Sequence, residues 1–231
     1  AFGDAATNMA IDASLLNTLP TNTAAFRHYA WTEPAITFGY TQAIKTVQAI
    51  IPENLRLCRR LTGGGIVDHR NDWTYALVLQ STLPAAQLPA TELYAIIHRC
   101  LQQALQRQLI ESELAPCPRA CKPTAMPAIL SSDQCFVQAT ANDVIRPDGV
   151  KIAGAAMKRT RDGRLVQGSI DRAALPDELD LHAFATSFQQ ALAEQLALPI
   201  GTMEAIHSLF NRTLIEAERQ RFESMAWQAK R

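Results

Sequence analysis

Three consecutive glycines at positions 63–65, set between two strand-like runs, constrain this chain more than any other feature. The segment reads Arg59-Arg60-Leu61-Thr62-Gly63-Gly64-Gly65-Ile66-Val67-Asp68-His69. Glycine lacks a Cβ and tolerates positive φ, so a ligand can lie directly on main-chain N–H groups. Neighbouring strand side chains point to opposite faces, so at most one of the two arginines is expected to point inward. The segment predicts either a floor for an anion or polar acyl group, or a plain glycine-rich hairpin with a solvated arginine pair.

Hydrophobic periodicity divides the first half of the chain into short strands and two helices. We expect four strands before residue 80, over residues 25–31, 35–40, 55–60 and 74–79. A helix is expected over 5–19, with Asp4 or Thr7 as its N-cap and Pro20 as its stop. The clearest helix covers 91–109 behind a Thr91 cap, because its apolar residues recur at helical spacing.

The second half begins with a proline-rich stretch over 116–132, which predicts a long loop and a candidate lid. After it we expect a strand near Phe136, then a hairpin that pairs 144–146 with 150–156 through Pro147-Asp148-Gly149. A strand around 164–170, a helix over about 181–196 and a C-terminal helix over about 211–229 complete the prediction.

Composition limits the classes of protein that this chain can represent. Its 231 residues are 48% hydrophobic and 19% charged, which predicts a globular fold, here one domain over 1–231 with its core in 5–200. The 22 basic and 22 acidic residues give no net charge, so we expect no nucleic-acid partner and no membrane partner. The odd set of five cysteines suits a reducing compartment, and we expect a cytoplasmic protein.

Lys151 and Cys135 are the candidate chemical groups outside the glycine segment. Lys151 stands between Val150 and Ile152 in an apolar strand, where an inward ammonium needs an anionic or carbonyl partner. Gly154, Ala155 and Ala156 then leave room beside it for a ligand. The alternative is that Lys151 points outward into solvent. Cys135 beside Phe136 is either a small buried hydrophobe or a nucleophile whose thiolate a nearby ammonium favours.

The other cysteines and histidines suggest no metal site. Cys117 and Cys121 alone cannot complete a four-coordinate zinc site, and no further ligand follows at a supporting spacing. We therefore predict no bound metal. His28, His98, His182 and His207 are scattered over strand and helix faces and are interpreted as structural, whereas His69 directly follows the glycine segment.

Taken together, these motifs resemble the lipoate-protein ligase and octanoyltransferase family, which shares its catalytic domain with biotin protein ligases. The glycine segment, the first helix around Asn8-Met9-Ala10-Ile11-Asp12 and the stretch Pro34-Ala35-Ile36-Thr37-Phe38-Gly39-Tyr40-Thr41-Gln42 occur in the family's order. They are followed by Val150-Lys151-Ile152-Ala153-Gly154-Ala155-Ala156 and Gln167-Gly168-Ser169-Ile170. The match covers residues 8 to about 172, although the family often has His-Gly at 167–168.

The resemblance implies an α/β (α+β) domain, similar to the biotin/lipoate protein ligases, with a mixed sheet flanked by helices and a tunnel for a medium-chain acyl group. Such enzymes attach lipoate or octanoate to one lysine of a lipoyl carrier domain, such as the glycine cleavage H protein or a dehydrogenase E2 lipoyl domain. It implies a substrate site that the following residues border: Arg60, Thr62, Gly63, Gly64, Gly65, His69, Asn142, Asp143, Gly154, Ala155 and Gly168. The family's strand before the first helix is expected to be missing here.

Two chemistries remain open for such a domain. A cysteine-dependent octanoyltransferase needs no cofactor and carries its cysteine in a Cys-Phe pair one hairpin before the lysine, which Cys135-Phe136 and Lys151 resemble. The pair Thr74-Tyr75 is similar to the same subclass. A lipoate-protein ligase uses ATP and Mg²⁺ to form lipoyl-AMP, and Asn142-Asp143 resembles the pair that faces that adenylate and its metal. A carrier-binding domain without catalysis is the third alternative.

Overall fold

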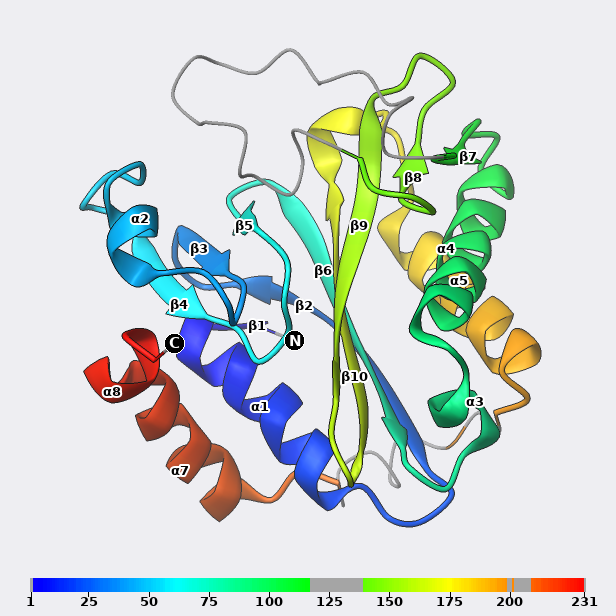
Figure 1. Cartoon of the computed structure of the whole chain (residues 1–231). Helices are drawn as coiled ribbons and strands as arrows, with labels where there is room; N and C mark the ends of the chain where they lie inside the picture. Colours follow the sequence, from blue (N-terminus) through cyan, green and yellow to red (C-terminus); the bar gives the residue numbers. More distant parts are fainter. Residues whose placement is uncertain (1, 117–138, 199–200, 202–208, 231) are drawn as a thin grey trace.

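The computed structural model describes residues 2–116, 139–198, 201 and 209–230. Within these residues seven strands form the larger sheet, in the order β1-β2-β6-β10-β9-β8-β7 (Figure 1). The strands are β1 (Phe2–Gly3), β2 (Ala24–Trp31), β6 (Asp72–Gln80), β10 (Gly163–Asp171), β9 (Lys151–Arg159), β8 (Val144–Ile145) and β7 (Glu113–Leu114). β1 runs parallel to β2, and the other neighbouring pairs are antiparallel. The expected mixed sheet is confirmed.

A smaller sheet carries the glycine segment. It comprises β4 (Arg56–Arg59), β3 (Ala35–Phe38) and β5 (Ile66–Asp68), in the order β4-β3-β5 among the described residues. The glycines connect β4 to β5, which both pair with β3. The short helix α2 (Ile44–Gln48) covers this sheet through Val47, which packs with Ile36, Phe38, Ile51 and Ile66. Figure 1 shows the small sheet beside β6, above α1 and α7.

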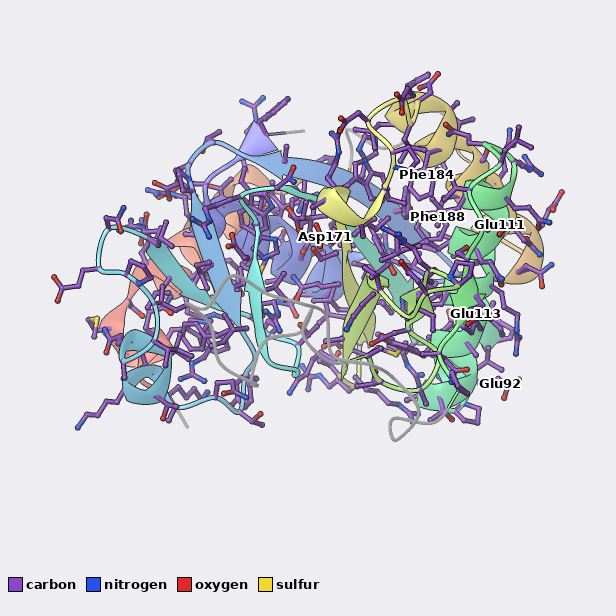
Figure 2. All side chains as sticks on the ribbon, turned by 90° about the horizontal axis from the view of Figure 1, so that it is seen from above. Glu92, Glu111, Glu113, Asp171, Phe184 and Phe188 are labelled. Atoms are coloured by element: carbon purple, nitrogen blue, oxygen red, sulfur yellow. The ribbon has the colours of Figure 1, made fainter. Side chains whose placement is uncertain are left out.

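Helices α4 (Ala90–Gln106) and α5 (Leu181–Gln195) cover one face of the larger sheet. Their apolar stripes form the main core with the inward residues of β6, β9 and β10. In Figure 2 the labelled Phe184 and Phe188 extend from α5 toward this core, where their rings contact Trp73. The short helix α3 (Pro84–Gln87) and a 3₁₀ turn (Arg172–Ala174) complete this side.

Helix α1 (Ala5–Thr18) covers the opposite face, and α7 (Arg212–Glu223) and α8 (Met225–Gln228) lie outside it (Figure 1). α1 begins at Asp4, whose carboxylate accepts a hydrogen bond from the Thr7 N–H at 2.7 Å, so Asp4 is the N-cap. The second core lies between α1, the sheet and two aromatic residues from the C-terminal helices, Phe222 and Trp227.

Several expected boundaries are wrong in detail. α4 begins after Pro89 rather than Thr91, and no side chain caps it. The expected C-terminal helix is two helices, because Ser224 adopts an extended conformation after α7 and its hydroxyl accepts from the Trp227 N–H to begin α8. Residues 72–80 and 151–159 extend further as strands than expected, since β10 pairs with residues 72–80 and 153–159.

Three short strands were not predicted from the sequence: β1, β5 and β7 (Glu113–Leu114). β5 has only three residues, too few for an alternating pattern to be recognised. β1 precedes α1, where no strand was expected, and its Phe2 and Gly3 pair with Ala30 and Trp31. The hairpin through Pro147-Asp148-Gly149 is confirmed, with Gly149 at φ 90°. The expected strand near Phe136 and nearly all of the expected 116–132 loop lie outside the described residues.

No helix in the described ranges combines the length and the apolar character that crossing a membrane requires.

Candidate active site

Lys151 is buried at the start of β9 and forms an ion pair with Asp143. Its Nζ lies 2.7 Å from Asp143 Oδ2, and the two side chains are only 6% and 1% exposed. An ammonium removed from water needs such an anion. The alternative that Lys151 points into solvent is therefore wrong, and the partner is the aspartate that precedes β8.

Asp143 accepts hydrogen bonds on both carboxylate oxygens. Besides Lys151, Oδ2 accepts from the backbone N–H of Thr140 at 2.7 Å and from its hydroxyl at 3.1 Å. Oδ1 accepts from the Tyr94 hydroxyl, which α4 supplies. Burial and the neighbouring carboxylate hold the pKa of Tyr94 well above its usual value, so the hydroxyl keeps the proton that it donates. Asp143 is thus committed to the donors around it.

The backbone beside Asp143 is held by His98, one turn after Tyr94 on α4. Asn142 lies at φ 69°, in the left-handed region that asparagine tolerates better than most residues. Its carbonyl lies 2.6 Å from His98 Nδ1. A carbonyl oxygen only accepts, so Nδ1 carries the proton. Burial lowers the pKa of His98, which keeps the ring neutral in this arrangement. The expected structural role of His98 fits this contact.

Gly154 keeps the space next to the Lys151 ammonium open. A Cβ at position 154 would lie 2.8 Å from both Cε and Nζ of Lys151 and 3.1 Å from Asp143 Oδ1. The next residue, Ala155, donates its backbone N–H to the Tyr94 hydroxyl at 3.0 Å. A glycine at position 154 therefore leaves room for the Lys151 ammonium, as the sequence pattern predicts. The hydrogen bond from Ala155 to Tyr94 was not predicted.

Arg59 and Arg60 are both buried, which corrects two expectations. The small sheet is covered on both faces, so opposite side-chain directions do not expose either arginine. Arg59 donates to the Gln228 carbonyl at 2.8 and 3.1 Å and lies over the Phe38 ring. Arg60 donates to the carbonyls of Gly63 and Gly65, each at 2.9 Å. The solvated-pair alternative is wrong, and the Arg60 guanidinium fixes the shape of the glycine loop.

The glycines of this loop allow a close approach of two backbone segments. Gly64 has φ 86°, and a Cβ on Gly39 would lie 1.9 Å from the Gly64 carbonyl oxygen. The Gly39 N–H donates to the Gly65 carbonyl at 3.2 Å. All three glycine carbonyls thus lie next to Arg60 or Gly39. A side chain at Gly39 would break this contact.

His69 connects the two sheets instead of standing alone behind the glycines. Its Nε2 lies 2.7 Å from the Thr37 hydroxyl and its Nδ1 lies 2.7 Å from Asp72 Oδ2. Arg60 donates to the same Thr37 hydroxyl at 2.8 Å, so a hydrogen-bonded chain runs from Arg60 to Asp72. The ring also stacks on Trp31 at 4.0 Å. Both ring nitrogens are occupied, and a substrate contact of His69 stays a prediction.

Gln167, the residue that departs from the family pattern, links the glycine loop to α1. Its Oε1 accepts from the Thr62 hydroxyl at 2.7 Å, and its Nε2 donates to Asp12 Oδ2 at 2.7 Å. Asp12 also binds Arg27 at 2.7 Å, with the pair 0% and 9% exposed. These contacts explain why an amide fits here, since one end must accept and the other must donate.

Gly168 faces the ring of Tyr75 on the neighbouring strand. The two residues are directly paired in register, and a Cβ at position 168 would lie 2.2 Å from two ring carbons. On this face the missing side chain makes room for Tyr75. A role of Gly168 in the acyl pocket stays a prediction.

Of the five cysteines, the structure describes Cys58 and Cys100, which are both buried free thiols. Burial raises the pKa of each to about 12, so neither forms an appreciable thiolate near neutral pH. Cys135, its neighbour Phe136, Cys117 and Cys121 lie outside the described residues. Within the described ranges, no three histidine, cysteine or acidic side chains gather into a metal-binding group.

The structure brings together some predicted residues and adds others. Lys151, Asp143 and Gly154 form one group, while Arg60, Thr62 and the glycines form a second, linked through Gln167 to Asp12. The sequence patterns did not single out Tyr94, which lies beside the apolar stripe of α4. A tyrosine there, one turn before a histidine, was the available signal.

A sequence model described as the lipoyl protein ligase A/B catalytic domain matches residues 4–196. The chain belongs to this family. The octanoyltransferase LipM of Kyrpidia tusciae is 31% identical over 174 residues, which cover 73% of this chain and 62% of that protein. The LipM of Bacillus subtilis is 29% identical over 171 residues, covering 71% and 60%. The chain thus spans about three fifths of the length of these relatives.

Solved structures of lipoyl protein ligases share the fold at low identity. A lipoate-protein ligase A bound with ATP superimposes with a TM-score of 0.69 at 14% identity, covering 100% of this chain and 96% of that one. A bipartite lipoate protein ligase from Thermoplasma acidophilum, solved in a study with its E2 lipoyl domain, gives 0.68 at 17%, covering 99% and 92%. The expected fold class is confirmed by this likeness.

Proposed function

We propose that this domain transfers an octanoyl or lipoyl group to the lysine of a lipoyl carrier domain, through a thioester on Cys135 and without ATP. The relatives that support this are named octanoyltransferases, at 27–31% identity. As a proposal, residues 1–231 act as one catalytic domain whose core lies in 5–200.

The observation that carries the proposal is the buried group of Lys151 and Asp143. An ammonium in a water-poor site stabilises negative charge on a nearby thiolate or acyl oxygen. In the ligase alternative, Asp143 would instead face a metal and an adenylate. Among the described residues its oxygens accept from Lys151, Tyr94 and Thr140, which supports the proposal that Asp143 holds the Lys151 ammonium.

The proposed reaction has two steps, a thioester exchange onto Cys135 and then aminolysis of the acyl-cysteine. The Cys135 thiolate attacks the carbonyl carbon of the octanoyl thioester on the donor, and the donor thiolate leaves and takes up a proton. The neutral amine of the carrier lysine then attacks the acyl-cysteine carbonyl, forming the amide, releasing the Cys135 thiolate and losing one proton to solvent. We propose that Lys151 stabilises the thiolate and the developing oxyanion. This chemistry needs no cofactor.

The proposed acyl and carrier sites lie between the two groups of residues described above. Arg60, Thr62 and Gly63–Gly65 would border the acyl group on one side, with Gly154 and Ala155 on the other. Asn142, His69 and Gly168 would complete the border. The proposed carriers are the glycine cleavage H protein or a dehydrogenase E2 lipoyl domain, and the expected compartment is the cytoplasm.

The proposal is tested by ATP-free transfer from octanoyl-acyl carrier protein to a lipoyl carrier domain. Cys135→Ser is expected to abolish transfer, because serine is not ionised near neutral pH and reacts poorly without a general base. Cys100→Ala is the matched control, since it removes a buried thiol that cannot ionise, and it is expected to transfer like the wild type.

Two outcomes would replace the proposal. Transfer that requires ATP and survives Cys135→Ser, together with lipoate-dependent pyrophosphate release, would identify a lipoate-protein ligase. Carrier binding without acylation under either protocol, unchanged in Lys151→Ala, would identify a non-catalytic carrier-binding domain.

A further inference from the structure

Two polar side chains of helix α4, one turn apart, contact the two residues that precede β8. Tyr94 donates to the Asp143 carboxylate, and His98 contacts the Asn142 carbonyl. The two rings also touch each other edge to face at 4.2 Å between centroids. Residues four apart lie on the same helix face, so one rigid element fixes the position of this loop.

The Tyr94 hydroxyl accepts a hydrogen bond from β9 at a residue that does not pair with β8 in the described part of the chain. Within the described residues, β8 pairs with β9 only at Lys151 and Ala153. Beyond that point the Ala155 N–H donates to the Tyr94 hydroxyl oxygen at 3.0 Å. A hydroxyl has one proton, and here it is directed to Asp143 Oδ1. The same oxygen thus joins the edge of β9 to the carboxylate that holds Lys151.

We propose that Tyr94 is a positioning residue, whose hydroxyl orients the Asp143 carboxylate so that Asp143 in turn fixes the Lys151 ammonium. The role in catalysis rests on the proposed function, whereas the positioning rests on the contacts alone. Without the hydroxyl, Asp143 Oδ1 loses a donor and the Ala155 N–H loses its acceptor. The carboxylate is then free to rotate about its remaining contacts with Thr140 and Lys151.

The other titratable groups that face this cluster are few in the described part of the chain. His98 from α4 and Tyr75 from β6 both feel the Asp143 charge. The His98 Nδ1–H is committed to the Asn142 carbonyl, and the Tyr75 hydroxyl makes no hydrogen bond among these residues, so neither replaces Tyr94 as a donor to Asp143. Tyr75 is a matched control, because its buried hydroxyl has no hydrogen-bond partner among these residues.

The test compares Tyr94→Phe with Tyr75→Phe in ATP-free octanoyl transfer. A misplacement of about 1 Å can cost about 100-fold, so for Tyr94→Phe we expect kcat to fall about 10- to 100-fold while KM for the carrier stays within about twofold. The acid limb of its pH–rate profile is expected to move to higher pH, since a loosened ammonium stabilises the thiolate less. Tyr75→Phe is expected to match the wild type in kcat, in KM for the carrier and in the acid limb of the pH–rate profile.

A second readout does not depend on the reaction. Acetic anhydride labelling followed by peptide mass spectrometry measures how well Lys151 is protected, with Lys158 on the same strand as the internal reference. Tyr94→Phe is expected to increase Lys151 labelling several-fold, and Tyr75→Phe to leave it unchanged. Equal labelling of Lys151 in the two variants would overturn the proposal. If wild-type protein shows no ATP-free transfer, the proposed function fails, while the labelling result still decides the role of Tyr94.

Discussion

The replacement Gly154→Ala should impair catalysis without unfolding the protein. The new Cβ would lie 2.8 Å from both Cε and Nζ of Lys151, whose ammonium is 2.7 Å from Asp143. Carbon contacts normally begin near 3.5 Å, so the ammonium must retreat by about 0.7 Å. A shift approaching about 1 Å at a reacting group can cost about 100-fold. We expect kcat/KM to fall about 10- to 100-fold.

The stability cost of this replacement should be small. The closest atoms are the far end of the flexible Lys151 side chain, which can move without displacing backbone. Asp143 Oδ1, at 3.1 Å, needs to give by only a few tenths of an ångström. Alanine also lowers the entropy of the unfolded chain relative to glycine, which contributes about 0.4–1 kcal/mol in favour of folding. We therefore expect the free energy of unfolding to change by less than about 1 kcal/mol, a value within the range of surface substitutions and small repackings.

The assay is ATP-free octanoyl transfer to a lipoyl carrier domain, measured alongside urea denaturation. Gly201→Ala is the control, because a Cβ there meets nothing within 4 Å. The control should keep wild-type activity and stability. A folded Gly154→Ala variant with wild-type kcat/KM would refute the assignment of Lys151, and an unfolded variant would refute the packing argument.

Three further predictions concern stability. Gly168→Ala should destabilise by about 3 kcal/mol in urea denaturation, because its Cβ meets the buried, rigid ring of Tyr75; a change below about 0.5 kcal/mol would contradict the packing. Asp12→Asn should cost about 3 to 5 kcal/mol in the same assay, because it leaves the buried guanidinium of Arg27 without its counter-charge; a neutral effect would show that the pair is not buried in solution. Burial lowers the pKa of His98 below the usual 6.5, so protons bind the unfolded state preferentially as pH falls below about 6.5, and stability should fall there. His98→Gln should flatten that loss, and an unchanged pH dependence of the denaturation midpoint would contradict it.

The larger elements could be predicted from the sequence because each has a strong local signal. The apolar spacing of residues 91–109 and the turn at Pro147-Asp148-Gly149 both led to elements that the structure contains. Boundaries were less predictable, since Thr91 has the chemistry of a cap yet the chain enters α4 from Pro89. The break at Ser224 depends on packing of Trp227 against the second core, which no local pattern reports.

The candidate site could be predicted only where a residue is unusual for its place. Lys151 in an apolar strand required a partner, and Asp143 is that partner. The burial of Arg59 could not be predicted from the sequence. The alternation of side chains along β4 does not reveal that α8 covers the face of the strand to which Arg59 points. The role of Tyr94 could not be predicted either, since its hydroxyl contacts residues that lie 49 and 61 positions further along the chain.

The central claim, acyl transfer through Cys135, is tested most directly by intact-mass spectrometry of the protein after incubation with octanoyl-acyl carrier protein and no ATP. The proposal predicts an octanoyl adduct that hydroxylamine removes, that maps to Cys135 and that is lost in Cys135→Ser. An unmodified protein that acylates its carrier only when ATP is added would contradict the thioester route.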